Sequence, residues 1–145
     1  MPIRGIKRVQ RNMHQVLDEI RNERTYKVLT QCYLIGAGYS DQMTPIDTSF
    51  LVNSRFHLMR DTRSGMSVIY GYMAEYAGWV HDAPGKLKGE PRKHFGKTRE
   101  GVAFGGGTEK GQYWDPNAEP EFLRKGFEEE GLEEIIRAIE RGYKV

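Results

Sequence analysis

The sequence predicts a single α+β domain (1–145): a small, mostly antiparallel sheet flanked by long N-terminal and C-terminal helices, with a long extended loop. Two observations predict this fold. Apolar residues recur every three or four positions near both ends of the chain, as in amphipathic helices. Between them, two partly alternating segments are joined by a short turn. We expect a helical arm at 1–39, a short helix plus strands at 44–81, an extended loop at 82–118 and a C-terminal helix at 119–142.

Length and composition fit one globular domain with a modest core. The chain has 145 residues, of which 38% are hydrophobic and 29% are charged. No apolar run approaches the roughly 20 residues that span a bilayer, and no signal-peptide pattern follows Met1. We therefore expect no membrane partner and synthesis in the cytoplasm. The single Cys32 has apolar neighbours, which favours a buried inert thiol over a nucleophile.

The N-terminal arm carries one apolar row, formed by Ile6, Val9, Met13, Val16, Leu17 and Ile20. A second apolar run follows at 26–35. The arm is either one long helix or two helices, with Thr25 as the cap of the second. Gly36 and Gly38 are expected to end it, since glycine suits the left-handed geometry of helix ends.

The segment 44–54 is expected to change the direction of the chain and then to anchor it. Pro45 fixes its own φ and favours an extended Thr44. Asp47 or Thr48 can cap a short helix. The core anchors predicted here are Ile46, Phe50 and Leu51.

The next segments predict a β-hairpin, with strands at 55–61 and 66–72 and a turn at 62–65 that ends in glycine. Residues 73–81 form either a short helical turn or a third strand. The region is rich in aromatic residues, which either pack on the sheet or anchor a subunit interface, where Tyr and Trp are enriched. The candidate interface residues are Tyr72, Tyr76 and Trp79.

The loop at 82–118 is rich in glycine and proline, and so long a loop is generally functional or disordered. We expect an arm that becomes ordered on assembly, the alternative being a disordered insertion. Its basic and aromatic residues either contact nucleic-acid phosphates or, as we prefer, an acidic protein surface. They are Lys86, Lys88, Arg92, Lys93, Phe95, Lys97 and Arg99.

The C-terminal helix is expected to begin with Asn117 as its cap and Pro120 in its first turn. Phe122, Leu123 and Phe127 are its predicted core residues. Net charge is +2 overall but uneven, because residues 1–30 are basic and residues 115–145 are acidic. Ends of opposite charge favour head-to-tail packing of copies and disfavour a dedicated DNA-binding protein.

The sequence predicts no catalytic residues, no cofactor and no metal. Gly96-Lys97-Thr98 resembles the end of a phosphate-binding loop, but the position that needs the first glycine is Pro91. His81 and Asp82 offer two metal ligands without an evident third. Asp61 stands alone on the hairpin, which leaves a nuclease as a minor alternative.

Three segments resemble the tail-completion, or minor tail-component, proteins found at the neck of long-tailed bacteriophages. Thr44–Ser54 is similar to that family's "T-P-(V/I)-D-T-G-x-L-x-x-S" signature, with Ser49 in place of the usual glycine. Tyr72–Tyr76 with Val80-His81 is similar to its "Y-A-x-Y-V-(H/E)" segment. Ala118–Phe127 is similar to its "x-P-F-L-x-P-A-(L/F)" helix start, with Glu121 inserted and Gly126 where a helix former is usual.

The resemblance implies a non-enzymatic structural virion protein, made in the host cytoplasm. Such a protein forms a ring, six-fold to match the tail, that joins the head connector to the tail tube or tail terminator. DNA passes through the ring without sequence specificity. Two alternatives remain open: a small nucleic-acid-binding or nuclease-like protein, and an assembly factor that is absent from the virion.

Overall fold

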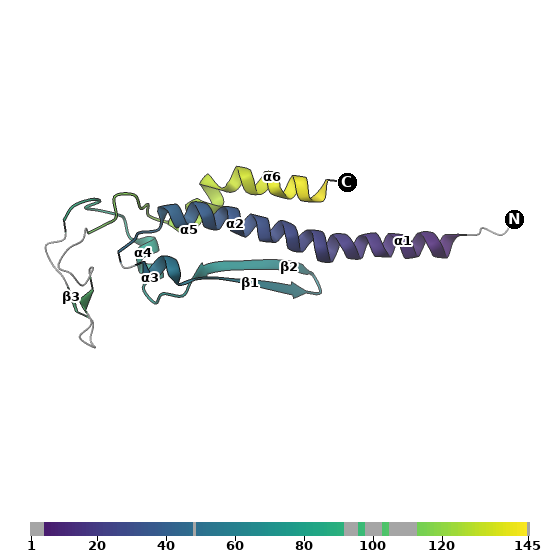
Figure 1. Ribbon diagram of the computed structural model, residues 1–145, viewed down its shortest axis with the longest axis horizontal. Helices are drawn as coiled ribbons and strands as arrows, with labels where there is room; N and C mark the ends of the chain where they lie inside the picture. The colour runs from purple at the N-terminus through teal and green to yellow at the C-terminus, as the bar shows by residue number, and fades with distance from the viewer. Residues whose placement is uncertain (1–4, 48, 92–95, 98–102, 105–112, 145) are drawn as a thin grey trace.

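The fold begins with one long helix (Figure 1). The computed structural model describes residues 5–47, 49–91, 96–97, 103–104 and 113–144. Helix α1 (Ile6–Glu19) passes through a π-helical segment, η1 (Ile20–Arg24), directly into α2 (Thr25–Met43). The predicted arm is therefore a single helix, and it extends beyond residue 39.

The single helix is the one of the two alternatives that is observed. Thr25 lies inside it, and its Oγ1 donates to the carbonyl oxygen of Ile20 at 2.9 Å within the wide π turn. The expectation that Gly36 and Gly38 end the helix is wrong, since α2 continues to Met43. Gly36 has a different role. It lies where the Phe127 ring packs against α2, and a Cβ there would come within 2.3 Å of that ring.

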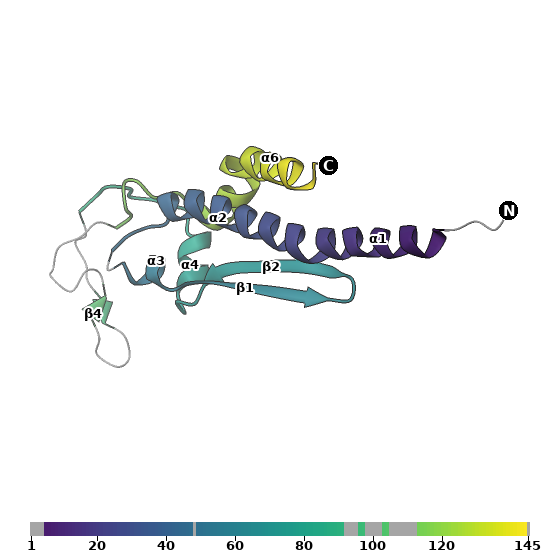
Figure 2. The same cartoon turned by 45° about the vertical axis from the view of Figure 1, so that its right-hand side comes forward.

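The predicted hairpin is confirmed. β1 (Arg55–Thr62) pairs antiparallel with β2 (Gly65–Tyr72), from Arg55 opposite Tyr72 to Thr62 opposite Gly65. Arg63 and Ser64 form the two-residue turn, and Gly65 follows it with a φ of 145°, which side chains rarely adopt. The hairpin runs alongside α2 in both views of the ribbon (Figures 1 and 2).

Two short helices connect the hairpin to its surroundings. α3 (Phe50–Asn53) precedes β1, and α4 (Ala77–Asp82) follows β2, so the helical alternative for residues 73–81 is the one observed. The residue at the cap position of α3 is Ser49, not Asp47 or Thr48 as predicted, and Thr48 lies outside the described residues. Ser49 has a left-handed φ of 62°, and its side chain forms no capping bond.

Ser49→Gly should stabilise the fold by about 0.5–1 kcal/mol, since glycine adopts a left-handed φ without the steric cost that serine bears. Urea unfolding of both proteins measures this gain. The matched control is Ser67→Gly in β2, where glycine weakens a strand and should reduce stability. If Ser49→Gly instead lowers the free energy of unfolding, residue 49 does not have a left-handed backbone conformation.

The C-terminal helix starts later than predicted and is interrupted. It consists of α5 (Phe122–Lys125), a second π-helical segment, η2 (Gly126–Glu130), and α6 (Leu132–Tyr143). Asn117 is not its cap, because Glu121 precedes α5 with a left-handed φ of 55°. α6 lies along α2 on the side away from the hairpin (Figure 1). The predicted α+β class, with a small antiparallel sheet between N-terminal and C-terminal helices, is confirmed.

The core lies where α3, α4 and α5 meet the end of α2. Leu51, Ala74 and Phe122 are buried together, which confirms Leu51 and Phe122 as core residues. Leu123 packs against this cluster and Phe127 against Tyr70, although both are only half-buried. The prediction that Ile46 and Phe50 are core residues is wrong, since both side chains are more than half exposed.

The two ends of the predicted extended loop contact each other, so the expectation of an extended segment over all of 82–118 is wrong at its ends. Lys88 and Trp114 form a parallel bridge, and the Gly89 amide donates to the Trp114 carbonyl at 2.9 Å. Trp114 is itself buried and donates from Nε1 to the carbonyl of Ala118. Between these ends, β3 (Gly96–Lys97) pairs antiparallel with β4 (Ala103–Phe104).

Candidate interaction surfaces

Tyr72, a candidate interface residue, instead holds α2 and the hairpin together. Its hydroxyl oxygen lies 3.0 Å from Ser40 Oγ, 3.0 Å from Thr44 Oγ1 and 3.1 Å from Asp41 Oδ1. Ser40 and Thr44 are buried. Asp41 also accepts from Tyr70 and pairs with Arg55 of β1. The expected interface role of Tyr72 is therefore replaced by a structural one.

Sequence reasoning missed this polar cluster. Ser40 and Thr44 are four residues apart, at the end of α2 and directly after it, which is the available signal. Their shared partner, Tyr72 of β2, lies 28 or more positions further along the chain. Burial raises the pKa of the Tyr72 hydroxyl, and it raises that of Tyr70 as well.

Tyr72→Phe should lower the free energy of unfolding by about 1–3 kcal/mol, because it leaves buried Ser40 and Thr44 hydroxyls short of a partner. The pKa of Tyr72 is higher in the folded state than in the unfolded state. The stability that Tyr72 contributes is therefore fully present below about pH 10, the ordinary tyrosine pKa, and is lost progressively as the pH rises above that value.

Urea unfolding at several pH values measures both effects of Tyr72→Phe. The alkaline decline in stability should be shallower in the variant than in the wild-type protein. Tyr26→Phe is the control, because Tyr26 is 53% exposed and should change stability by less than about 0.5 kcal/mol. Equal stability of wild type and Tyr72→Phe would contradict the structural role.

The other two candidate interface aromatics are on the surface. We call the neighbouring Phe50 and Tyr76, together with Trp79 further along α4, the α3–α4 patch. Trp79 is 84% exposed, and the rings of Phe50 and Tyr76 lie 6.2 Å apart. Exposed apolar side chains grouped in this way mark interaction surfaces on many proteins. Tyr76 and Trp79 therefore remain candidate interface residues, and Phe50 joins them from the predicted core.

Only part of the predicted basic surface falls in the described residues. Lys86 is exposed, and Lys88 pairs with Glu119 at 2.7 Å. Glu119 also pairs with Lys125 at 3.3 Å, and its two lysine partners lower its carboxyl pKa. This charge contact helps to hold the loop base on α5. Outside the described residues lie Arg92, Lys93, Phe95, Arg99 and the side chain of Lys97.

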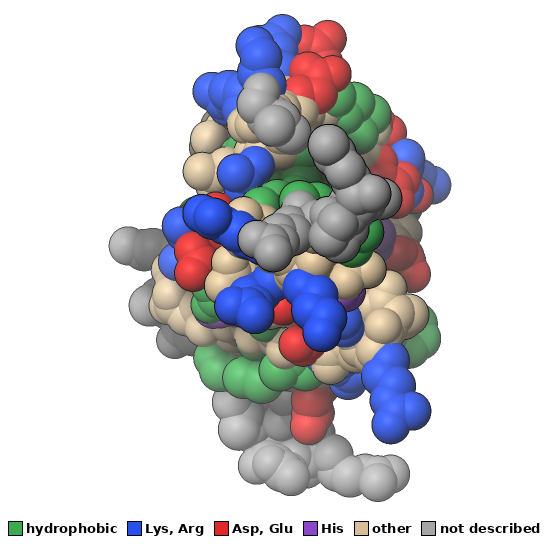
Figure 3. Space-filling model, turned by 90° about the vertical axis from the view of Figure 1, so that its right-hand side faces the viewer, with side chains coloured by type: hydrophobic (Ala, Val, Ile, Leu, Met, Phe, Trp, Pro, Cys, Tyr) green, Lys and Arg blue, Asp and Glu red, His purple; other side chains and the backbone are tan. Residues whose placement is uncertain are grey.

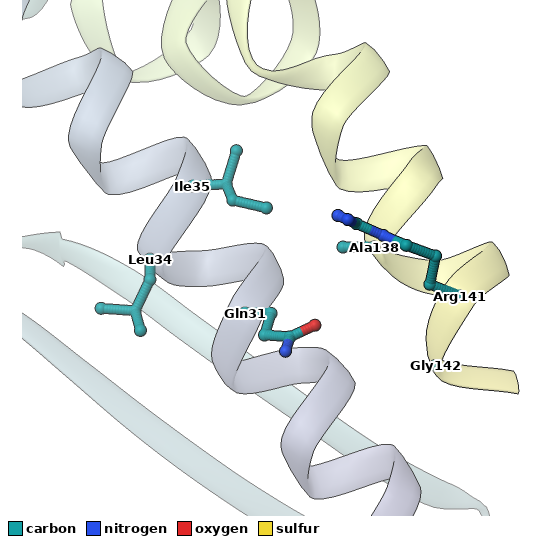
Figure 4. A pocket seen from close by; sticks show the side chains of 6 residues that line it. All are labelled: Gln31, Leu34, Ile35, Ala138, Arg141 and Gly142. Carbon is teal, nitrogen blue, oxygen red and sulfur yellow. The ribbon is translucent and has the colours of Figure 1, made fainter.

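Two shallow hollows lie along the contact between α2 and the C-terminal helix. The first, of about 440 Å³, is lined by Ile35 and Gln31 of α2, which point toward α6, and by Ala138 and Arg141 of α6 (Figure 4). The second, of about 520 Å³, is acidic, with four glutamates among its lining residues. Cys32, on α2, is half-buried, and burial raises the pKa of its thiol.

His81 and Asp82, the pair weighed as metal ligands, bond to each other, with His81 Nδ1 2.8 Å from Asp82 Oδ1. Within the described part of the chain, no three His, Cys, Asp or Glu side chains gather closely enough to hold a metal ion. None of the helices among those residues combines the length and apolar character needed to cross a membrane.

No protein-family model, no curated protein and no solved structure matches the chain.

Proposed function

We propose that this protein is a structural, non-enzymatic component of the neck or upper tail of a long-tailed bacteriophage. Its copies form a ring, six-fold like the tail, that joins the head connector to the tail tube or tail terminator. DNA passes through the ring without sequence-specific contacts. The proposal rests on the family resemblance of three separated segments.

One structural observation carries the proposal: the three segments that resemble the family build a single core. Leu51 from the first, Ala74 from the second and Phe122 from the third are buried together. The His81 ring also lies 5.2 Å from the Phe122 ring, and the Glu121 amide donates to the His81 carbonyl. Segments that define one fold are expected to pack together, whereas chance similarities have no reason to do so.

Exposed apolar surface supports the assembly part of the proposal. The α3–α4 patch is on the surface, and so are apolar rows on α1 and α6. Monomeric soluble proteins rarely expose several such groups, because water contact with apolar surface is unfavourable. A ring subunit needs two different surfaces that meet between neighbours, and these groups supply candidates for both.

The test combines native mass spectrometry of the full-length protein with a DNA-binding assay at several salt concentrations. The proposal predicts one closed oligomer, six-fold in copy number, with weak DNA affinity that is equal for unrelated sequences. Tight DNA binding at moderate salt, or metal-dependent cleavage, would contradict it and favour the nuclease-like alternative.

A further inference from the structure

Helix α1 carries an apolar row that no other described part of the chain covers. Ile6, Val9, Met13 and Val16 follow a spacing of three and four residues, and each is more than half exposed. α6 ends beside Thr25, where the Tyr143 hydroxyl donates to Thr25 Oγ1 at 2.7 Å. α1 therefore projects beyond both α6 and the hairpin (Figures 1 and 2).

The π-helical segment η1 determines where this row points. It inserts one extra residue into the helix, which keeps the α1 row in line with Val28 and Ile35 further along. Those two residues face α6, since Val28 lies against Gly142 and Ile35 points toward Ala138 (Figure 4). The side of the long helix that receives α6 thus continues along α1 without a covering helix.

Helix α6 carries a second, partly exposed row. Leu132, Ile136, Ile139 and Tyr143 are spaced by four, three and four residues, and each is about 40% exposed. Ala138 and Gly142, on another side of α6, pack on α2, and Tyr143 at the end of the row also reaches α2 with its hydroxyl. The rows on α1 and α6 span ten and eleven residue steps, about 15 Å each, so they match in length. Rows with this spacing are the seams along which two helices pack.

Charge favours one pairing of the two rows. Lys7, Arg8 and Arg11 lie in the first half of α1, and Asp18 and Glu19 lie at its end. On the face seen from the N-terminal end, Lys and Arg side chains lie interspersed with Asp and Glu side chains (Figure 3).

The C-terminal helix has the reverse order. Glu128–Glu130, Glu133 and Glu134 come first, and Arg141 and Lys144 come last. A parallel pair of α1 and α6 brings the basic start of α1 alongside the acidic start of the C-terminal helix, whereas an antiparallel pair brings the acidic ends together.

We infer that α1 of one copy packs parallel against α6 of a second copy, so that one contact covers both rows. Within each copy α6 runs antiparallel to α2, because Gly126 lies against Ser40 and Gly142 lies against Val28. A parallel α1–α6 contact therefore sets the long helices of the two copies in opposite directions, and a second, equivalent contact closes a two-fold pair. This pair is an association separate from the ring of the proposed function. Pairing of α1 with α1 would leave the α6 row uncovered.

The experiment uses two full-length variants with one defective surface each. Val9→Glu/Val16→Glu places charge in the α1 row, and Ile136→Glu/Ile139→Glu places it in the α6 row. Leu34→Glu is the matched control, because Leu34 is 56% exposed and belongs to neither the α1 row nor the α6 row. Circular dichroism checks that each variant is folded, and multi-angle light scattering measures its mass.

The wild-type protein and Leu34→Glu should associate. Each double variant should be monomeric, with self-association weakened by at least about thirtyfold. Mixing the two double variants in equal amounts should give a dimer and nothing larger, because each mixed pair retains one intact α1–α6 contact. This complementation distinguishes the proposed contact from pairing of α1 with α1.

Three results would overturn the inference: a wild-type protein that stays monomeric, an α1 or α6 variant that associates like wild type, or a mixture that stays monomeric. An α6 variant that associates normally while the α1 variant does not would indicate α1–α1 pairing. An α1–α6 pair that forms in solution, from a protein that is absent from phage particles, would disprove the proposed function alone. A protein present in particles whose pairing in solution tolerates both variants would disprove this contact alone.

Discussion

Leu51→Asp should leave the protein unfolded or severely destabilised, by about 3 kcal/mol or more. Leu51 is 4% exposed and packs with Ala74 and Phe122, where a carboxylate finds neither water nor a charge partner. Small domains are stable by about 5–15 kcal/mol, so this loss is a large part of the total. Urea unfolding followed by circular dichroism measures it.

The neighbouring substitution Phe50→Asp is the control for Leu51→Asp. Phe50 is 58% exposed, so a carboxylate there remains in water and the protein should fold. The cost should be about 1 kcal/mol, from the lost contact with the Tyr76 ring. Equal tolerance of Asp at both positions would show that Leu51 does not anchor the core.

Gly126→Ala should destabilise the protein by about 1–3 kcal/mol, even though alanine is the better helix former. A Cβ on Gly126 would lie 2.6 Å from the backbone nitrogen of Ser40, and neither helix backbone can move away cheaply. The φ of Gly126 is −61°, so its backbone conformation does not require glycine. The close approach of η2 to α2 is the reason for this residue.

Gly38→Ala on the opposing helix should have the opposite effect. Gly38 lies inside α2, and a Cβ there meets nothing within 4 Å. The substitution should therefore raise stability by about 1 kcal/mol, the difference in helix propensity between the two residues. Thermal unfolding of both variants compares the signs, and a stabilising Gly126→Ala would contradict the observed packing of η2 on α2.

Local sequence signals predicted the elements of this fold well. The hairpin was predicted from alternation and a turn that ends in glycine, and these signals act between residues that are close in sequence. The amphipathic rows predicted the terminal helices for the same reason. The buried positions of Leu51 and Phe122 followed from their apolar neighbours.

The errors concern contacts between distant segments. Ile46 and Phe50 are as apolar as Leu51, and only the path of the chain after Ser49 decides which of them is buried. Gly36 resembles a helix end in sequence, whereas its role is to admit the Phe127 ring from 91 positions away. The contacts of Trp114 at the loop base also depend on a distant partner, Gly85, and sequence reasoning did not find them.

The candidate surfaces were predicted in part. Tyr76 and Trp79 are exposed as expected, but Tyr72 in the same aromatic segment is held by Ser40 and Thr44. The amphipathic pattern of α1 predicted the apolar row but not that the row is exposed. The sequence does not show that α6 reaches only to Thr25 of the long helix and the hairpin only to Arg21, so that neither covers α1.

The position of this protein in phage particles tests the central proposal most directly. Purified particles of a tailed phage whose genome encodes the protein would be labelled with a gold-conjugated antibody against the full-length chain and viewed by electron microscopy. We predict label at the junction of head and tail. Label elsewhere on the particle would contradict the proposed position, and absence of the protein from intact particles would favour the assembly-factor alternative.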